Sequence, residues 1–284
     1  PTSHLKNLKP LPAADVLVDK CIECGFCEPK CPSRGLTLSP RQRIVSVREL
    51  SRRAAAGEPA GSIGEDYAYM GLDTCAACGL CSTACPVGIN VGDLTRRLRG
   101  RKLGNTARAV NAWTGEHFGT LANASRLGLS VGHAFSSVLG DNFLSRVSGG
   151  AWKKNMPYAG KAPAVRVTQG DPVVYFPGCG GRIFGPSVSG DAQLGDVIIE
   201  LLVRAGYAPR LPEGFDKLCC GQMLASKGMA EEAEGMSDTL EAALMKASEN
   251  GRYPVIMDAS ACSTRMQKHL AGRLQLYDFH EFAH

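Results

Sequence analysis

The chain has 284 residues, of which 44% are hydrophobic and 21% charged, and its formal net charge is +5. This composition is typical of a globular protein with about two domains and excludes a largely disordered chain. No apolar run reaches the roughly 18 residues of a membrane-spanning helix, and no signal for export precedes the first motif. We therefore expect a cytoplasmic protein without a transmembrane segment, and leave open a peripheral association with the inner face of the membrane.

Cysteine is the unusual part of the composition, with 12 residues. In a reducing compartment so many thiols indicate thiolate chemistry rather than a disulfide framework. Clusters held by thiolates are negatively charged and would offset the positive charge of the polypeptide. The basic residues lack interleaved aromatic residues or a known nucleic-acid module, so we expect no nucleic-acid partner.

Residues 1–15 contain three prolines and little periodicity, and we interpret them as a linker or the tail of a preceding domain. Two runs of the form C-x2-C-x2-C-x3-C-P follow, at Cys21–Pro32 and Cys75–Pro86. The spacer between the runs is predicted to be helical from Pro40 to Arg52, with apolar residues on one face (Ile44, Val47 and Leu50), and to form a loop over residues 57–64.

The two cysteine runs predict two cubane clusters. A loop with a cysteine at every third position can wrap three irons of a cluster, and the fourth cysteine of such a run ligates the other cluster. We therefore predict one [4Fe-4S] cluster on Cys21, Cys24, Cys27 and Cys85, and a second on Cys75, Cys78, Cys81 and Cys31. Zinc is the alternative, but structural zinc normally takes two separate CxxC pairs around a single ion.

Residues that flank these cysteines support close packing around a cluster. Gly25 and Gly79 allow the backbone to approach closely. We expect three apolar side chains to exclude water from the clusters, namely Ile22, Phe26 and Leu80.

A basic amphipathic helix is predicted after the second run, from Val91 to Leu103. Its arginines either form a solvated face, or dock on an acidic partner or compensate the charge of the clusters. Residues 107–147 are predicted to be mostly helical, and residues 151–168 have the Gly, Pro and Lys content of a linker. We place an α-helical ferredoxin domain with a helical extension at residues 16–150.

Residues 169–284 have a different pattern. Apolar runs at Val173–Phe176 and Tyr253–Met257 predict buried strands, and residues 192–205 and 229–249 predict helices. This alternation indicates a small α/β domain with a parallel sheet. The fold class predicted for the whole chain is therefore mixed α and α/β.

Four further cysteines lie in this α/β domain, where loops leave strands or enter helices: Cys179, Cys219, Cys220 and Cys262. Three interpretations stay open, a third metal site, buried structural thiols, or a redox-active thiol site. Arg182 and Lys227 would either offset thiolate charge or simply be solvated. The chain has no GxGxxG, Walker or acyl-transfer motif, so we assign no catalytic residue.

The long helical spacer resembles the α-helical ferredoxin type of the iron–sulfur subunits of succinate dehydrogenase and heterodisulfide reductase, over residues 15–105. The segments YFPGCGGRIFG, LCCGQMLASKG and MDASACSTR resemble the cysteine-rich CCG domain of heterodisulfide reductase and of glycolate or D-lactate oxidising enzymes. That resemblance implies a further iron–sulfur cluster. The fullest form of the motif ends in CxxC, whereas Cys262 is followed by Ser263, Thr264 and Arg265.

The stretch from His4 to Ile44 is similar to the junction between the flavin domain and the iron–sulfur half of FAD-linked D-2-hydroxy-acid dehydrogenases of the D-lactate and D-2-hydroxyglutarate type. It also resembles the glycolate oxidase iron–sulfur subunit. The resemblance implies FAD in a neighbouring domain or subunit as the electron donor, and a quinone, cytochrome or other carrier as acceptor.

The same resemblance implies that the substrate site lies outside this chain and that residues 169–284 are the first of two cysteine-rich repeats. The chain would then be part of a longer protein. The alternative function is thiol/disulfide redox catalysis at the CCG domain, as in heterodisulfide reductase.

Overall fold

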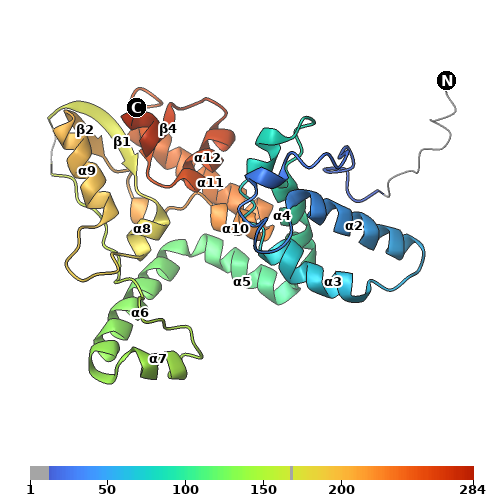
Figure 1. The fold of residues 1–284 in the computed structure, drawn as a ribbon. Coiled ribbons are helices and arrows are strands. Elements are labelled where there is room, and N and C mark those ends of the chain that lie inside the picture. The colour runs from blue at the N-terminus through green and yellow to red at the C-terminus, as the bar shows by residue number, and fades with distance from the viewer. Residues whose placement is uncertain (1–12, 167–168) are drawn as a thin grey trace. The chain divides into compact units, whose positions relative to one another are not determined.

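The computed structural model describes residues 13–166 and 169–284 (Figure 1). The chain divides into two compact units, the first of residues 1–105 with 225–229 and the second of 106–224 with 230–284. Most of the predicted N-terminal linker, residues 1–12, lies outside the described residues. The first unit is shorter than the predicted ferredoxin domain of residues 16–150, and that domain assignment stays a prediction.

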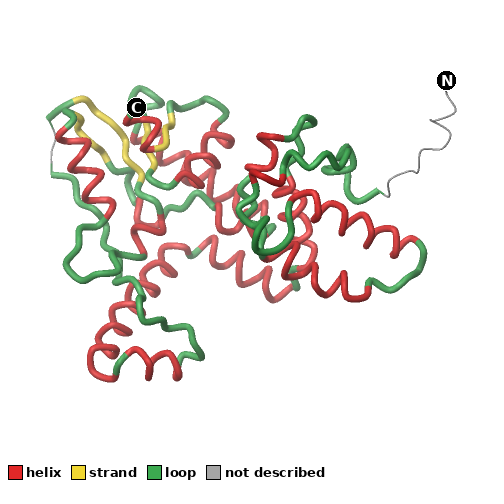
Figure 2. The backbone as a smooth tube through the Cα atoms, viewed as in Figure 1, coloured by secondary structure: helices red, strands yellow, loops and turns green. Residues whose placement is uncertain are grey.

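The first unit is built from helices and cysteine-bearing loops, and Figure 2 shows no strand among its described residues. Its longer helices are α2 (Pro40–Ala55), α3 (Gly61–Tyr67) and α4 (Val91–Lys102). Its short turns are η1 (Glu28–Lys30), η2 (Ala68–Asp73) and η3 (Leu80–Ala84). The predicted helical spacer and the predicted helix after the second cysteine run are confirmed.

Helix α3 corrects one prediction, because it begins at Gly61, inside the segment 57–64 that was expected to be a loop. A side chain at Gly64 would come within 2.7 Å of the Ala60 Cβ. Glycine is therefore needed at this position for close packing, and its presence did not signal a loop.

The core of the first unit lies between α2, α4 and the cysteine loops. Val18, Ile44 and Leu94 are at most 1% exposed, and the side chains of Cys21, Cys27 and Cys85 pack against this cluster. The predicted apolar face of α2 is confirmed for Ile44 and Val47, and Leu50 is partly buried. Because the cysteine loops rest on the helical core, the helices position the thiols.

The start of α2 is fixed by a capping box, in which the Ser39 side chain accepts from the Gln42 amide and the Gln42 side chain accepts from the Ser39 amide. The Ser39 hydroxyl also donates to Glu28 at 2.7 Å. We expect Ser39→Ala to destabilise the first unit by about 1 kcal/mol in urea unfolding. Ser51→Ala, inside the same helix, is the matched control, and an equal loss in both variants would contradict the capping role.

The second unit combines three helices with an α/β layer. The helices are α5 (Asn105–Glu116), α6 (Phe118–Leu139) and α7 (Asp141–Val147), which confirms the helical prediction for residues 107–147. The α/β part contains α8 (Cys179–Ile183), α9 (Leu194–Arg204), η4 (Phe215–Lys217), α11 (Ala230–Ala247), α12 (Ser260–Leu270) and α13 (Phe279–Ala283). Helix α10 (Gln222–Lys227) begins in the second unit and ends in residues assigned to the first. None of the described helices combines the length and apolar character needed to cross a bilayer.

Four parallel strands form the sheet in the order β2-β1-β3-β4: β1 (Asp171–Phe176), β2 (Tyr207–Arg210), β3 (Val255–Met257) and β4 (Leu276–Asp278). The predicted parallel sheet, with β1 and β3 as strands and α9 and α11 as helices, is confirmed. Helix α9 packs Ile198 and Leu202 against the sheet residues Val173 and Ile256. Figure 1 shows α9 and the pair α11–α12 on opposite sides of the strands.

Candidate iron–sulfur centres

The two cysteine loops of the first unit share one backbone conformation. The second and fourth residues after the first cysteine have positive φ in both loops, at Glu23 (59°) and Gly25 (83°), and at Ala77 (49°) and Gly79 (79°). In each loop the amide two residues on donates to the first cysteine, from Glu23 to Cys21 and from Ala77 to Cys75, at 3.4 Å. Left-handed residues turn the amides inward, so both loops curl around their own sulfurs.

The eight thiols gather in two groups that exchange their fourth member. One cavity is lined by Cys21, Cys24, Cys27 and Cys85, and another by Cys31, Cys75, Cys78 and Cys81. The short turns η1 and η3, which precede Cys31 and Cys85, contact each other. The grouping is the one that crossed ligation requires, and the binding of iron by these eight residues stays a prediction.

Burial shapes the protonation of these thiols. Desolvation raises the pKa of Cys27 to about 11. Desolvation also raises the pKa of Cys81, although the Val91 and Gly92 amides at the start of α4 act in the opposite direction. Thiols of this kind stay protonated at neutral pH unless a cation replaces the proton. Each group has one such thiol, Cys27 or Cys81, and four converging cysteines, a set that fits a [4Fe-4S] cluster.

Two buried arginines, Arg43 and Arg48, and the partly buried Arg99 hold the cysteine loops in place, and the sequence pattern did not predict this role. Arg43 donates to the Gly71 carbonyl at 2.9 Å, and Arg48 donates to the Cys21 carbonyl at 2.9 Å. Arg99 of α4 donates to the Cys75 carbonyl at 2.7 Å. The acceptors lie 24 to 28 residues away in sequence, so no local motif marks them.

The basic face of α4 is largely engaged within its own unit. Arg96 donates to the Ala77 carbonyl at 2.5 Å, and Arg97 pairs with Asp15 at 2.6 Å. The interpretation of this face as simply solvated is therefore wrong for the partly buried Arg96 and Arg99, whereas Arg97 is exposed.

The apolar side chains next to the cysteines do not exclude water as expected. Ile22, Phe26 and Leu80 are 67%, 63% and 49% exposed. Because successive loop residues turn the cysteines inward, their neighbours point outward. Water is kept from the two cavities instead by core residues such as Ile44 and Val91, which line them.

The four remaining cysteines also converge, although they come from three loops of the second unit. Cys179 follows β1, Cys262 lies in the first turn of α12 after β3, and Cys219 and Cys220 precede α10. The Cys219 and Cys179 sulfurs are 3.9 Å apart, and Cys220 is in hydrogen-bond contact with both Cys219 and Cys262. Since chain order reverses between β1 and β3, this is the edge where an open parallel sheet gathers functional groups.

Local contacts explain how these loops reach one another. Asp258, just after β3, accepts from the Gly178 amide at 2.5 Å and from the Tyr175 hydroxyl at 2.7 Å. At Gly221 (φ 77°) a side chain would come within 2.3 Å of the Ala233 carbonyl oxygen of α11. Glycine therefore follows the vicinal cysteines because only glycine lets the loop lie against the helix.

Two arginines, Arg182 and Arg265, donate to carbonyls of the loops that carry this second group of cysteines. Arg182 is 2% exposed and donates to the carbonyls of Pro177, Phe215 and Leu218, which adjoin the Cys179 and Cys219 loops. Arg265, three residues after Cys262, donates to the Cys220 carbonyl at 2.7 Å. Solvation, one of the two roles considered for Arg182, is wrong for this buried side chain, whereas Lys227 is exposed.

The partners of the arginine side chains indicate whether this region could hold a negatively charged centre. Nε and Nη2 of Arg126 are buried and have no hydrogen-bond partner among the described residues, and the Arg126 charge acts on Arg182, which in turn interacts with Cys179 and Cys219. Arg265 pairs with Glu234 at 3.2 Å, whereas Arg182 donates to carbonyls and forms no ion pair among the described residues. A buried cation of the latter kind is costly unless a negative group lies nearby. Thiolates bound to a metal cluster would supply that charge, so the residues present fit such a group.

The surroundings of the vicinal pair, Cys219 and Cys220, raise the pKa of both thiols. The contact with Cys179 lowers the pKa of Cys219, but its contact with Cys220 and its burial raise it more, to about 11. For Cys220 the contacts with Cys219 and Cys262 oppose each other, and burial brings the pKa to about 12. A redox-active thiol needs a lowered pKa, so these values favour a metal site or structural thiols over free thiol chemistry.

Comparison with known proteins agrees with the geometry of the first unit. Residues 17–89 match the family model described as the 4Fe-4S dicluster domain. This segment is therefore an iron–sulfur domain, as the paired cysteine runs predicted, and its matched range contains all eight cysteines of the two groups.

Two curated proteins are also similar to the chain. A fumarate reductase (CoM/CoB) subunit of Methanothermobacter marburgensis is 25% identical over 270 residues, which cover 92% of this chain and 46% of that protein. A probable glycolate oxidase iron–sulfur subunit of Bacillus subtilis is 35% identical over 84 residues, which cover 28% of this chain and 17% of that protein. The chain thus spans less than half the length of these relatives. No solved structure matches the chain.

Proposed function

We propose that this chain is the electron-transfer portion of a flavin-dependent D-2-hydroxy-acid dehydrogenase, acting on D-lactate, D-2-hydroxyglutarate or glycolate. Reduced FAD in a neighbouring domain or subunit supplies the electrons, and a quinone, cytochrome or other carrier accepts them. The substrate carbon is oxidised outside this chain. The protein works in the cytoplasm, at the inner face of the membrane if its acceptor is a quinone.

The observation that carries this proposal is the exchange of Cys31 and Cys85 between the two cysteine loops. The exchange brings two groups of four thiols into one small unit. Iron–sulfur centres take one electron at a time, so a pair of them suits the division of a two-electron flavin reduction into single transfers. The name of the Bacillus subtilis relative, with its 2-hydroxy-acid substrate, supports the proposed donor.

We further propose that Cys179, Cys219, Cys220 and Cys262 hold a third iron–sulfur centre. Their convergence at the edge of the sheet and the buried arginines beside them support an anionic group at this place. The proposal keeps the domain assignment made from the sequence, with an α-helical ferredoxin domain at residues 16–150, a linker at 151–168, and a cysteine-rich CCG domain at 169–284. Arg265 in place of a last cysteine leaves four thiols for the third centre.

Iron analysis tests the number of centres. Protein purified without oxygen should contain about eight irons and eight acid-labile sulfides if two cubanes are bound, and more if the third centre is occupied. Replacing Cys220 by serine should remove only the iron above eight. Iron clearly below eight in intact protein would contradict the two-cubane proposal.

Flavin reduction tests the proposed donor. In the full-length protein, D-lactate, D-2-hydroxyglutarate or glycolate should bleach the flavin absorbance and then produce the EPR signals of reduced clusters. If the flavin were bleached but the clusters stayed oxidised, electrons would not pass from the flavin to this chain, and the proposed relay would be wrong. If none of the three acids bleached the flavin, the proposed substrate class would be wrong.

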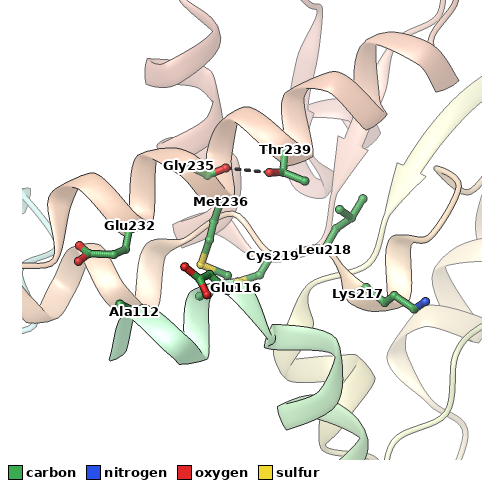
Figure 3. Close-up of a pocket in the computed structure, with 10 residues that line it drawn as sticks. Ala112, Glu116, Lys217, Leu218, Cys219, Glu232, Gly235, Met236 and Thr239 are labelled. Atoms are coloured by element: carbon green, nitrogen blue, oxygen red, sulfur yellow. Dashed lines mark hydrogen bonds between the residues drawn. The ribbon is translucent and has the colours of Figure 1, made fainter. Parts of the chain in front are cut away.

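A second candidate function is thiol/disulfide redox catalysis at the cysteines of the second unit. A pocket of about 330 Å³ lies beside Cys219, lined by residues from α5, η4 and α11. Figure 3 shows Glu116, Met236 and Cys219 among the residues that line this pocket. The Methanothermobacter relative is named for CoM and CoB, which favours a sulfur substrate.

Enzyme assays distinguish the two functions. A disulfide reductase should reduce small disulfides with dithionite-reduced protein, and Cys219→Ser should abolish that activity. The flavin-linked relay predicts that Cys219→Ser leaves cluster reduction by the hydroxy acid in the first unit unchanged. Disulfide reduction by the wild-type protein at a rate that Cys219→Ser eliminates would favour the second function.

A further inference from the structure

The two groups of cysteines in the first unit differ in the charges around them. Glu23 and Arg41 line the cavity of Cys21, Cys24, Cys27 and Cys85, which we call the first centre. Lys30 and Arg43 line the cavity of Cys31, Cys75, Cys78 and Cys81, which we call the second centre. No carboxylate is among the described residues that line the second cavity.

The cations next to the first centre are neutralised by carboxylates. Arg41 pairs with Glu28 at 3.0 Å, and 42% of its side chain is exposed. Arg48, which holds the Cys21 carbonyl, pairs with Glu23. Charge pairs of this kind produce only a weak net field at the first centre, and solvent screens the exposed pair further.

Arg43, beside the second centre, is in a different situation. It is 1% exposed, and its Nη1 lies 3.7 Å from the sulfur of Cys31. Its other hydrogen bonds go to neutral acceptors, the carbonyls of Gly71 and Met70 and the hydroxyl of Thr74. Among the described residues no carboxylate forms an ion pair with its guanidinium. The full positive charge therefore faces Cys31.

Charge and hydrogen bonds at the sulfur ligands are two of the factors that set the reduction potential of an iron–sulfur centre. A reduced centre carries one more negative charge than an oxidised one, so a fixed cation nearby stabilises the reduced state. We propose that Arg43 makes the second centre the stronger oxidant of the two. This inference rests on the proposed relay function.

The consequence is a direction for electron flow within the unit. An electron that enters from reduced flavin passes from the first centre to the second, so the first is oxidised and the second is reduced by one electron. No proton is transferred and no bond is made. The acceptor would then be reached from the side of Cys31, Cys75, Cys78 and Cys81.

Redox titration followed by EPR tests the proposal in the full-length, cluster-loaded protein. Cys24→Ser and Cys78→Ser first assign the two signals to the first and second centres. We expect Arg43→Gln to lower the reduction potential of the second centre by at least about 59 mV, which is a tenfold change in the equilibrium constant of a one-electron couple. The reduction potential of the first centre should stay unchanged. Arg43→Lys should retain part of the effect. Arg41→Gln is the matched control, and it should change the reduction potential of the first centre by less than about 59 mV.

Lys30→Glu provides a second test that does not disturb the core, because Lys30 is exposed and lines the same cavity. This substitution should lower the reduction potential of the second centre, but by less than Arg43→Gln does. If the Arg43→Gln protein loses its iron, the potentials of Lys30→Glu and Arg43→Lys decide whether a cation beside the second centre raises its reduction potential. Unchanged potentials in protein with eight irons would overturn this inference alone, whereas too little iron in the wild-type protein would overturn the proposed function itself.

Discussion

Cys31→Ala should remove the iron of the second centre, although the other three cysteines of that centre lie more than 40 residues further along the chain. Iron should fall by about four per chain, because a cubane has four irons and cannot be held well by three thiolates. The EPR signal that disappears should be the one lost in Cys78→Ala. The signal lost in Cys24→Ala should persist.

The converse exchange gives the control for this prediction. Cys85→Ala should abolish the same signal as Cys24→Ala and spare the signal assigned by Cys78→Ala. If Cys31→Ala and Cys24→Ala instead removed the same signal, each loop would bind its own cluster with all four of its cysteines. That result would contradict the crossed arrangement on which both the proposed function and the direction of electron flow depend.

The cysteine groups could be predicted because their chemistry is local. Spacing within Cys21–Pro32 and Cys75–Pro86 limits how each loop can fold around a metal, and the two identical runs imply a shared geometry. The structure adds a detail that the spacing does not contain, since Glu23 and Ala77 adopt positive φ in spite of their side chains. Non-glycine residues in this conformation cost energy that the surrounding structure must offset.

The partners of the supporting arginines could not be predicted, because they lie far away in the sequence. Arg182 could be singled out by its place beside Cys179, but nothing marks Arg43, and each side chain is at most 2% exposed. Arg43 donates to a carbonyl 28 residues away, and Arg182 donates to carbonyls 33 and 36 residues away. Hydrophobic periodicity predicts where helices lie but carries no information about such partners.

Two strands were also missed for physical reasons. β2 contains Pro209 and lies at the edge of the sheet, where the absence of one amide donor is tolerated. β4 has only three residues, Leu276–Asp278, and depends on pairing with β3 rather than on its own pattern. Strands of this kind are specified by their neighbours in the sheet, so a local pattern cannot reveal them.

Arg182→Met should have the largest effect in the second unit. The substitution leaves the carbonyls of Pro177, Phe215 and Leu218 without their buried donor, and each unsatisfied acceptor costs about 1–3 kcal/mol. Removal of a buried cation recovers part of that cost. We expect a net loss of about 3 kcal/mol in the free energy of unfolding of this unit, measured by urea denaturation.

Metal content separates the two roles of Arg182. If it also faces an anionic third centre, Arg182→Met should lose the iron above eight per chain even in protein that remains folded, and Arg182→Lys should retain part of it because the charge is kept. Arg204→Gln, an exposed residue paired with Glu200, is the control and should change stability by less than about 0.5 kcal/mol. If folded Arg182→Met protein kept all of its iron, the role of Arg182 would be only structural, to hold the Cys179 and Cys219 loops together.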